Sequence, residues 1–114
     1  MRVNKPRTRV TKAAPKPSPE FERLMAQLRK HLPDFRERYG LRSLGVFGSY
    51  VGGRQGKRSD LDLLAEFDRA PTLLQFVRLQ REIGERLGVK VDLVMRTALK
   101  PSIGARILKE VVPV

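Results

Sequence analysis

The sequence has no cysteine and only one histidine among its 114 residues. Without cysteine there is no disulfide and no thiolate metal site, a composition typical of proteins in a reducing compartment, so we expect a cytoplasmic protein. The single histidine, His31, falls in a stretch with helical spacing, and we expect no histidine-based catalysis.

Long hydrophobic runs are missing as well. No stretch approaches the roughly 18 apolar residues that a membrane-spanning helix needs. The N-terminus is basic, but no apolar run follows it, so we expect neither a membrane protein nor a secretory signal. A length of 114 residues is enough for one compact domain with a modest core.

Residues 1–19 lack any acidic side chain and hold six basic residues and four prolines. They account for half of the net charge of +12. Such a segment buries too little apolar surface to offset its ordering entropy, so we expect a flexible basic tail over 1–19 and a folded domain over 20–114. A solvated tail that aids solubility is the simpler interpretation, and weak, nonspecific nucleic-acid binding is the alternative.

The spacing of apolar residues predicts the element order α-β-turn-β-α-β-α. Ser18 and Pro19 are typical of a helix start, Gly40 of its end, and Pro33 predicts a kink or a split within it. The expected elements are a helix to about residue 39, strands at 41–47 and 61–67, a helix from about 73 to Gly88, a strand at 89–95, a helix from Pro101, and an extended end at 111–114. A turn occupies 50–59, with one helical turn considered at 49–52. The fold class is α/β or α+β, a small sheet with helices packed against it.

Three aspartates carry the candidate chemistry. Asp60 and Asp62 are two residues apart on an expected strand, so their side chains share one face. Asp92 lies within Val-Lys-Val-Asp-Leu-Val, and joins them if its strand neighbours theirs. Adjacent carboxylates repel unless a cation or proton lies between them, and hard oxygen donors suit Mg²⁺. Three carboxylates match a two-metal phosphoryl or nucleotidyl transfer site.

Gly48 and Ser49 supply the complementary part. A glycine between strand and turn lets the backbone approach a phosphate closely, and free N–H groups with a hydroxyl face an anion there. Arg54, Lys57 and Arg58 lie in the same loop and are candidates to neutralise a triphosphate. Each piece alone has a simpler explanation, namely a common turn, the polar face of a strand or a solvated loop. Their order and spacing together favour a nucleotide site.

These residues resemble the minimal nucleotidyltransferase (MNT) family of the DNA polymerase β-like nucleotidyltransferase superfamily. The signature is Gly48-Ser49, ten intervening residues and Asp60-Leu61-Asp62, followed by Val91-Asp92-Leu93. The similarity extends over roughly residues 20–114. Many relatives carry Arg-Gly soon after Gly-Ser, whereas this chain has Gly52-Gly53, so that guanidinium is missing unless Arg54 replaces it.

The resemblance implies a small mixed sheet flanked by helices. It implies that Asp60 and Asp62 hold Mg²⁺, with Asp92 as the third carboxylate, and that Gly48 and Ser49 bind the triphosphate. Members of the family often pair with a helical HEPN-type toxin and act as its antitoxin, some by adding AMP to a toxin tyrosine.

Three functions stay open at this point. The first is transfer of AMP from ATP to a protein acceptor, with Asp92 as candidate base, in a HEPN/MNT toxin–antitoxin pair. The second is a small-molecule nucleotidyltransferase of the antibiotic-modifying type, although 114 residues leave little surface for a separate acceptor pocket. The third is a catalytically weak binding module that acts by occlusion.

Overall fold

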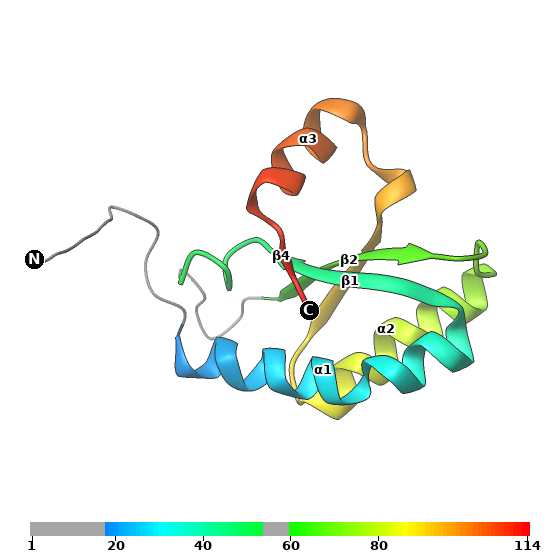
Figure 1. Cartoon of the computed structure of the whole chain (residues 1–114), viewed down its shortest axis with the longest axis horizontal. Helices are drawn as coiled ribbons and strands as arrows, with labels where there is room; N and C mark the ends of the chain where they lie inside the picture. The colour runs from blue at the N-terminus through cyan, green and yellow to red at the C-terminus, as the bar shows by residue number, and fades with distance from the viewer. Residues whose placement is uncertain (1–17, 54–59) are drawn as a thin grey trace, which may run out of the picture.

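The computed structural model describes residues 18–53 and 60–114. Within these residues, three α-helices alternate with the strands of a mixed sheet (Figure 1). The elements are α1 (Pro19–Tyr39), β1 (Leu41–Phe47), β2 (Leu61–Phe67), α2 (Leu73–Leu87), β3 (Val91–Met95), a short 3₁₀ turn (Arg96–Ala98), α3 (Pro101–Glu110) and β4 (Val112–Pro113). The predicted element order and the small mixed sheet flanked by helices are therefore confirmed.

The sheet has the strand order β3-β2-β1-β4. β1 pairs antiparallel with β2 and with β4, whereas β2 and β3 run parallel. The parallel pair requires a crossover, which α2 provides. The expected strand at 89–95 begins two residues later, at Val91.

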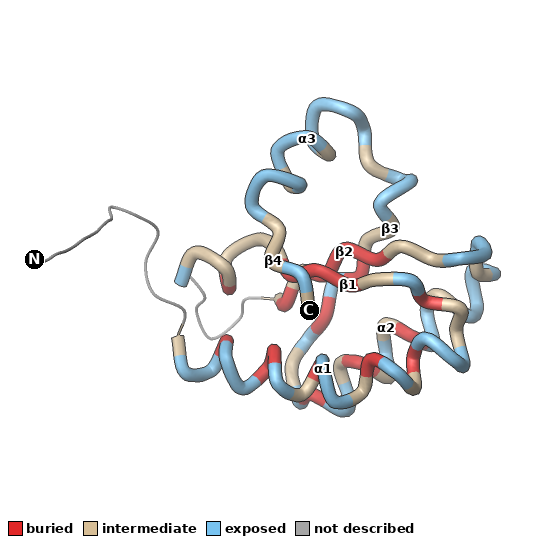
Figure 2. The backbone as a smooth tube through the Cα atoms, viewed as in Figure 1, coloured by how far each residue is buried: buried red, intermediate tan, exposed pale blue. Residues whose placement is uncertain are grey.

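The core lies on one face of the sheet, against α1 and α2, which run below it in Figure 1. The strands alternate, so Leu61 and Leu63 of β2 point into this core and are fully buried. Figure 2 shows the buried positions on the sheet and on the sides of α1 and α2 that face it. The helices contribute chiefly Leu24, Leu28, Phe35, Leu79 and Ile83, all of which have no exposed surface.

Both ends of α1 follow the sequence signals. The hydroxyl of Ser18 accepts a hydrogen bond from the Phe21 N–H, Pro19 occupies the first turn, and Gly40 ends the helix with a left-handed φ of 68°. Of the kink or split predicted at Pro33, the split does not occur, because a single helix runs from Pro19 to Tyr39. Pro33 is exposed, while Leu32 and Phe35 beside it are buried in the core, so packing outweighs the backbone hydrogen bond that a proline removes.

An ion cluster ties α1 to α2 on the outer side of the core. Arg38 bonds Asp34 at 2.8 Å and also contacts Glu82 of α2. Glu82 further accepts hydrogen bonds from the Tyr39 hydroxyl, at 2.8 Å, and forms an ion pair with Arg86, at 2.6 Å. This cluster adds polar contacts between the two helices to the apolar packing of the core.

The opposite face of the sheet is mostly free of helices. α3 stands above it in Figure 1 and buries none of its residues, and the chain then returns as β4 to the edge of β1. Within the described ranges, no helix is long and apolar enough to cross a bilayer. The sheet therefore has one face that stabilises the fold and one that is available for chemistry.

Candidate active site

Asp62 and Asp92 lie side by side on the open face of the sheet. The parallel register of β2 and β3 pairs Asp62 directly with Asp92, between the buried pairs Leu61–Val91 and Leu63–Leu93. Because neighbouring residues on a strand point to opposite faces, burial of the leucines forces both carboxylates to the other side. The sequence argument required β3 to neighbour β2, and it does.

Asp60 comes two residues before Asp62 and is half-buried. The N–H of Leu61, between them, donates to the carbonyl of Lys90 at 2.8 Å, which extends the β2–β3 pairing to the start of the strand. The strand alternation thus places Asp60 and Asp62 on one face, beside Asp92.

The electrostatics of the cluster are visible in Asp62. Burial raises the pKa of Asp62 above its ordinary value, and the negative charges of Asp92 and Asp60 raise it further. Both effects disfavour the ionised form of this carboxyl group. A cation placed between the carboxylates would offset the repulsion from Asp92 and Asp60, because the negative charges that repel one another attract the cation.

Gly48 shows why a glycine ends β1. Its φ is +83°, a left-handed conformation that side chains disfavour. A Cβ at this position would lie 2.2 Å from Oδ2 of Asp62, closer than atoms can approach. The backbone of the Gly-Ser turn therefore lies directly against the Asp62 carboxylate.

The turn after Gly48 is held by its own hydrogen bonds. The N–H of Val51 donates to the carbonyl of Gly48 at 3.1 Å, and the N–H of Gly53 to that of Tyr50 at 3.3 Å. The segment 49–53 forms hydrogen-bonded turns, so the helical turn considered at 49–52 is not what the structure adopts. Tyr50, which follows Ser49 in the turn, is buried in the core and anchors the turn beside the aspartates.

The fit to a metal ion follows from the donor set. The three aspartates offer oxygen atoms from neighbouring backbone positions, the donor type that Mg²⁺ prefers. Within residues 18–53 and 60–114, however, no three acidic or histidine side chains converge closely enough to form a preassembled cage. The register of the strands therefore brings the aspartates to one face of the sheet without a preassembled cage.

Arg54, Lys57 and Arg58 lie outside the described residues, as does most of the predicted tail. Sequence reasoning missed a second cluster on the same face, built from Ser43, Glu66 and Arg96. A signal for it existed, since Glu66 is four residues from Asp62 and strand alternation puts both on one face.

The fold and the paired aspartates beside a Gly-Ser turn define the nucleotidyltransferase class. The chain belongs to the nucleotidyltransferase domain family, whose sequence model matches residues 28–114. Within that family it belongs to the minimal nucleotidyltransferases. It is accordingly an enzyme of nucleotidyl transfer.

This chain is similar in sequence or in structure to the following three proteins. Protein adenylyltransferase MntA of Thermococcus cleftensis is 44% identical over 92 residues, which cover 81% of this chain and 93% of that protein. A solved structure assigned to the minimal nucleotidyltransferases is 36% identical, with a TM-score of 0.71, over 82% of this chain and 95% of that one. A solved complex of a tri-AMPylated Shewanella oneidensis HEPN toxin with an MNT antitoxin matches at 17% identity and a TM-score of 0.54, over 82% of this chain and 67% of that one, which shows the shared fold.

Proposed function

We propose that this enzyme transfers AMP from ATP to a hydroxyl group of a protein partner, a HEPN-type toxin, and acts as its antitoxin. The name of the Thermococcus relative, which is similar over most of both chains, supports protein adenylyl transfer. The complex of an MNT antitoxin with an AMPylated HEPN toxin, which shares the fold, supports the choice of partner.

The observation that carries this proposal is the register that pairs Asp62 with Asp92, together with the approach of Gly48 to Asp62. Asp60, Asp62 and Asp92 would hold the divalent cation, and Gly48 and Ser49 would bind the triphosphate through backbone N–H groups and the hydroxyl. When bound, Mg²⁺ would neutralise charge on the phosphate oxygens during transfer. Arg54 and Lys57 are proposed to assist at the triphosphate.

The reaction proceeds by displacement at the α-phosphorus. The acceptor oxygen forms a bond to the α-phosphorus as the bond to the β-phosphate oxygen breaks, which releases pyrophosphate. The acceptor proton passes to the carboxylate of Asp92, which is exposed on the edge strand β3 and therefore accessible to an incoming protein. Asp62 lies between this base and the Gly-Ser turn, where the leaving pyrophosphate would be held.

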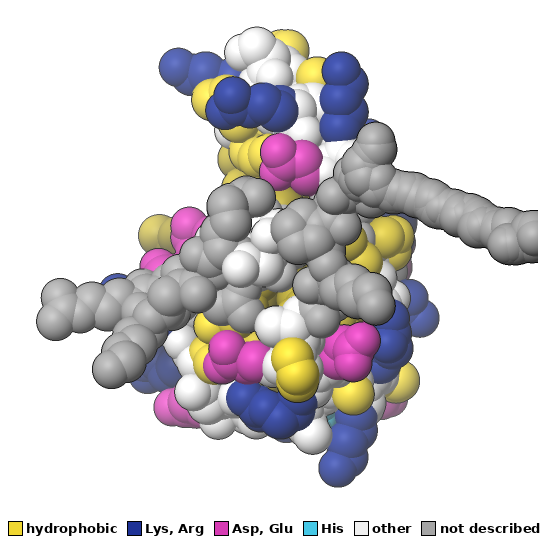
Figure 3. All heavy atoms as spheres, turned by 90° about the vertical axis from the view of Figure 1, so that its left-hand side faces the viewer, with side chains coloured by type: hydrophobic (Ala, Val, Ile, Leu, Met, Phe, Trp, Pro, Cys, Tyr) yellow, Lys and Arg dark blue, Asp and Glu magenta, His cyan; other side chains and the backbone are white. Residues whose placement is uncertain are grey.

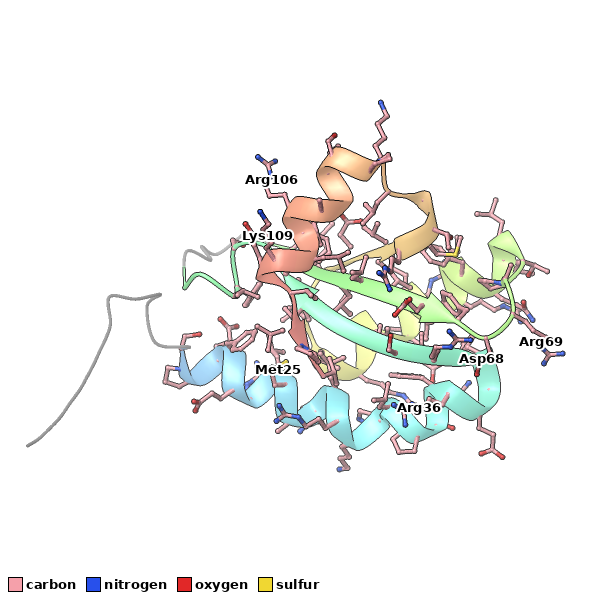
Figure 4. All side chains as sticks on the ribbon, turned by 45° about the horizontal axis from the view of Figure 1, so that its top comes forward. Met25, Arg36, Asp68, Arg69, Arg106 and Lys109 are labelled. Carbon is pink, nitrogen blue, oxygen red and sulfur yellow. The ribbon has the colours of Figure 1, made fainter. Side chains whose placement is uncertain are left out.

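The test uses Asp62→Asn and Asp92→Asn with labelled ATP, Mg²⁺ and a purified HEPN-type toxin as the acceptor. Each variant keeps the side-chain shape but loses the charge, so we expect label transfer to the partner to fall at least a hundredfold. Asp68→Asn is the matched control, because Asp68 lies at the opposite end of β2, exposed and paired with Arg42 (Figure 4).

Equal label transfer by Asp62→Asn and wild type would refute the assignment. Neutralisation of the toxin by Asp62→Asn without label transfer would instead favour the occlusion mechanism. Transfer of label to a small-molecule acceptor but not to the HEPN protein would favour the antibiotic-type alternative.

A further inference from the structure

A cavity of about 290 Å³ lies on the open face of the sheet, between the strands and α3. Its walls are largely apolar, with Leu64 on the sheet side, Leu108 from α3 and Val111 from the link to β4. Gly45 of β1 completes this side, and a Cβ there would collide with Val111, 2.4 Å away. The cavity is therefore formed by the way the C-terminal segment crosses the sheet.

This cavity continues the candidate active site along the strands. Leu64 follows Asp62 by two residues on the same face, which is about 7 Å along β2. The neighbouring strand repeats the step, since Phe47 pairs with Asp62 and Gly45 with Leu64. A molecule bound at Asp62 that extends along the sheet away from Gly48 would enter the cavity.

The chemistry of transfer indicates which part of the substrate extends there. The acceptor attacks the α-phosphorus in line with the departing pyrophosphate, so these two groups lie at opposite ends of one line. The acceptor is at the Asp92 end, and the pyrophosphate is at the end formed by the Gly-Ser turn. The nucleoside leaves the α-phosphate at an angle to that line. The sheet lies beneath Asp62, and the cavity lined by Leu64 and Glu66 offers space further along β2.

We infer that the cavity under α3 binds the base of the nucleotide substrate, an inference that rests on the proposed nucleotidyl transfer. A volume of about 290 Å³ is at the lower limit of ligand pockets, roughly 300–1,000 Å³, and suits one planar ring system better than a whole nucleotide. Leucine and valine side chains would pack against the faces of the ring.

The far end of the cavity is polar and has a defined hydrogen-bonding character. The carboxylate of Glu66 accepts a hydrogen bond from the Ser43 hydroxyl, at 3.0 Å, and one from Arg96, at 2.8 Å. These two bonds, that of Arg96 first, lower the pKa of Glu66 and keep it ionised. An ionised carboxylate has about four acceptor positions, so it can take a further hydrogen bond from an exocyclic amino group, which adenine has and uracil lacks.

The exposed apolar residues of α3 supply a matched pair of variants. Leu108 is 42% exposed and lines the cavity, whereas Ile103, at 45%, does not line it. Arg106 and Lys109 project from α3 away from the sheet in Figure 4, and Figure 3 shows Lys and Arg side chains over the upper part of the molecule, where α3 lies. Leu108 is thus the apolar residue of this pair that borders the cavity, whereas Ile103 is an exposed residue outside it.

The experiment compares Leu108→Asn with Ile103→Asn by calorimetric titration in the presence of Mg²⁺, using ATP, UTP and inorganic tripolyphosphate. Leu108→Asn removes apolar contact without adding charge, so we expect its affinity for ATP to fall about tenfold while that for tripolyphosphate stays unchanged. Ile103→Asn should bind both as wild type does, and wild type should prefer ATP to UTP. Unchanged tripolyphosphate binding also shows that the variant is folded.

Two results would overturn the inference in distinguishable ways. If wild type binds ATP and tripolyphosphate equally and Leu108→Asn changes neither affinity, the base does not enter the cavity, and the proposed transfer reaction stands. If wild type binds neither ligand, the proposed function itself is wrong and the base site with it. Equal affinity for ATP and UTP would exclude Glu66 as the selecting group.

Discussion

Replacing Gly48 by alanine perturbs the candidate site at its closest contact. The substitution places a methyl carbon 2.2 Å from Oδ2 of Asp62, and 3.1 and 3.3 Å from Cγ and Cβ of the same side chain. An ordinary contact begins at about 3.4 Å, so either the carboxylate rotates away or the turn moves, by more than 1 Å in total. The left-handed φ of +83° adds a backbone cost of about 1–2 kcal/mol for any L side chain.

These two effects predict different losses. The backbone cost lowers the melting temperature by roughly 5–15 °C, since 1 kcal/mol corresponds to about 4–8 °C in a domain of this size. Displacement of a reacting group by about 1 Å can cost on the order of a hundredfold in rate. We therefore expect Gly48→Ala to transfer label about a hundred times more slowly than wild type, at a temperature where both proteins are folded.

Gly40→Ala separates stability from activity. Gly40 has a similar φ of +68°, but a Cβ there meets no atom within 4 Å, and it lies at the end of α1, away from the aspartates. This variant should lose comparable stability and keep its transfer rate. If Gly48→Ala transfers AMP as fast as Gly40→Ala does, the close approach of the turn to Asp62 is not required for catalysis and our reasoning about the site is wrong.

Two predictions concern pH and stability. The raised pKa of Asp62 means that the folded state binds its proton more tightly than the unfolded state, so this carboxyl group destabilises the metal-free protein above its ordinary pKa, near 3.9. Asp62→Asn should therefore melt at a higher temperature than wild type at neutral pH, and thermal melts should show the gap closing as pH falls through that range; a gap that is absent at neutral pH would contradict this. Glu82 is the opposite case, because burial opposes its ionisation but hydrogen bonds from Arg38 and Tyr39 prevail and lower its pKa. Ionised Glu82 therefore stabilises the fold above the ordinary glutamate pKa, and this stabilisation is lost as the pH falls through the lowered pKa. Glu82→Gln should cost about 1 kcal/mol at neutral pH, allowing for solvent screening, and little in acid, and a loss that did not depend on pH would count against the ion cluster.

One face of the sheet packs in the core, and the other face carries the charged residues of the candidate site. Leu61, Leu63 and Ala65 of β2 pack on α1 and α2, while Asp62 and Glu66 of the same strand face the open side. A charge on the open face keeps contact with solvent and ligands and does not disturb the core. This arrangement lets one small sheet support both the core and a charged site.

Local signals in the sequence determined the elements and their ends. Ser18, Gly40 and Gly88 set helix boundaries through caps whose geometry depends on neighbouring residues alone, and the alternation of leucine with aspartate assigned the faces of β2. The spacing from the Gly-Ser pair to Asp60 and Asp62 was sufficient to indicate the family. Such features involve short stretches of chain, so they can be read without knowing the packing.

Contacts between distant segments were decided by the tertiary structure alone. The register that sets Asp62 beside Asp92 depends on the crossover through α2, and the approach of Gly48 to Asp62 depends on the pairing of β1 with β2. Pro33 stays within one helix because its neighbours are buried, a balance that local propensity does not contain. The cavity under α3 is lined by both Leu64 and Leu108, which are distant in the sequence, so only folding brings its walls together.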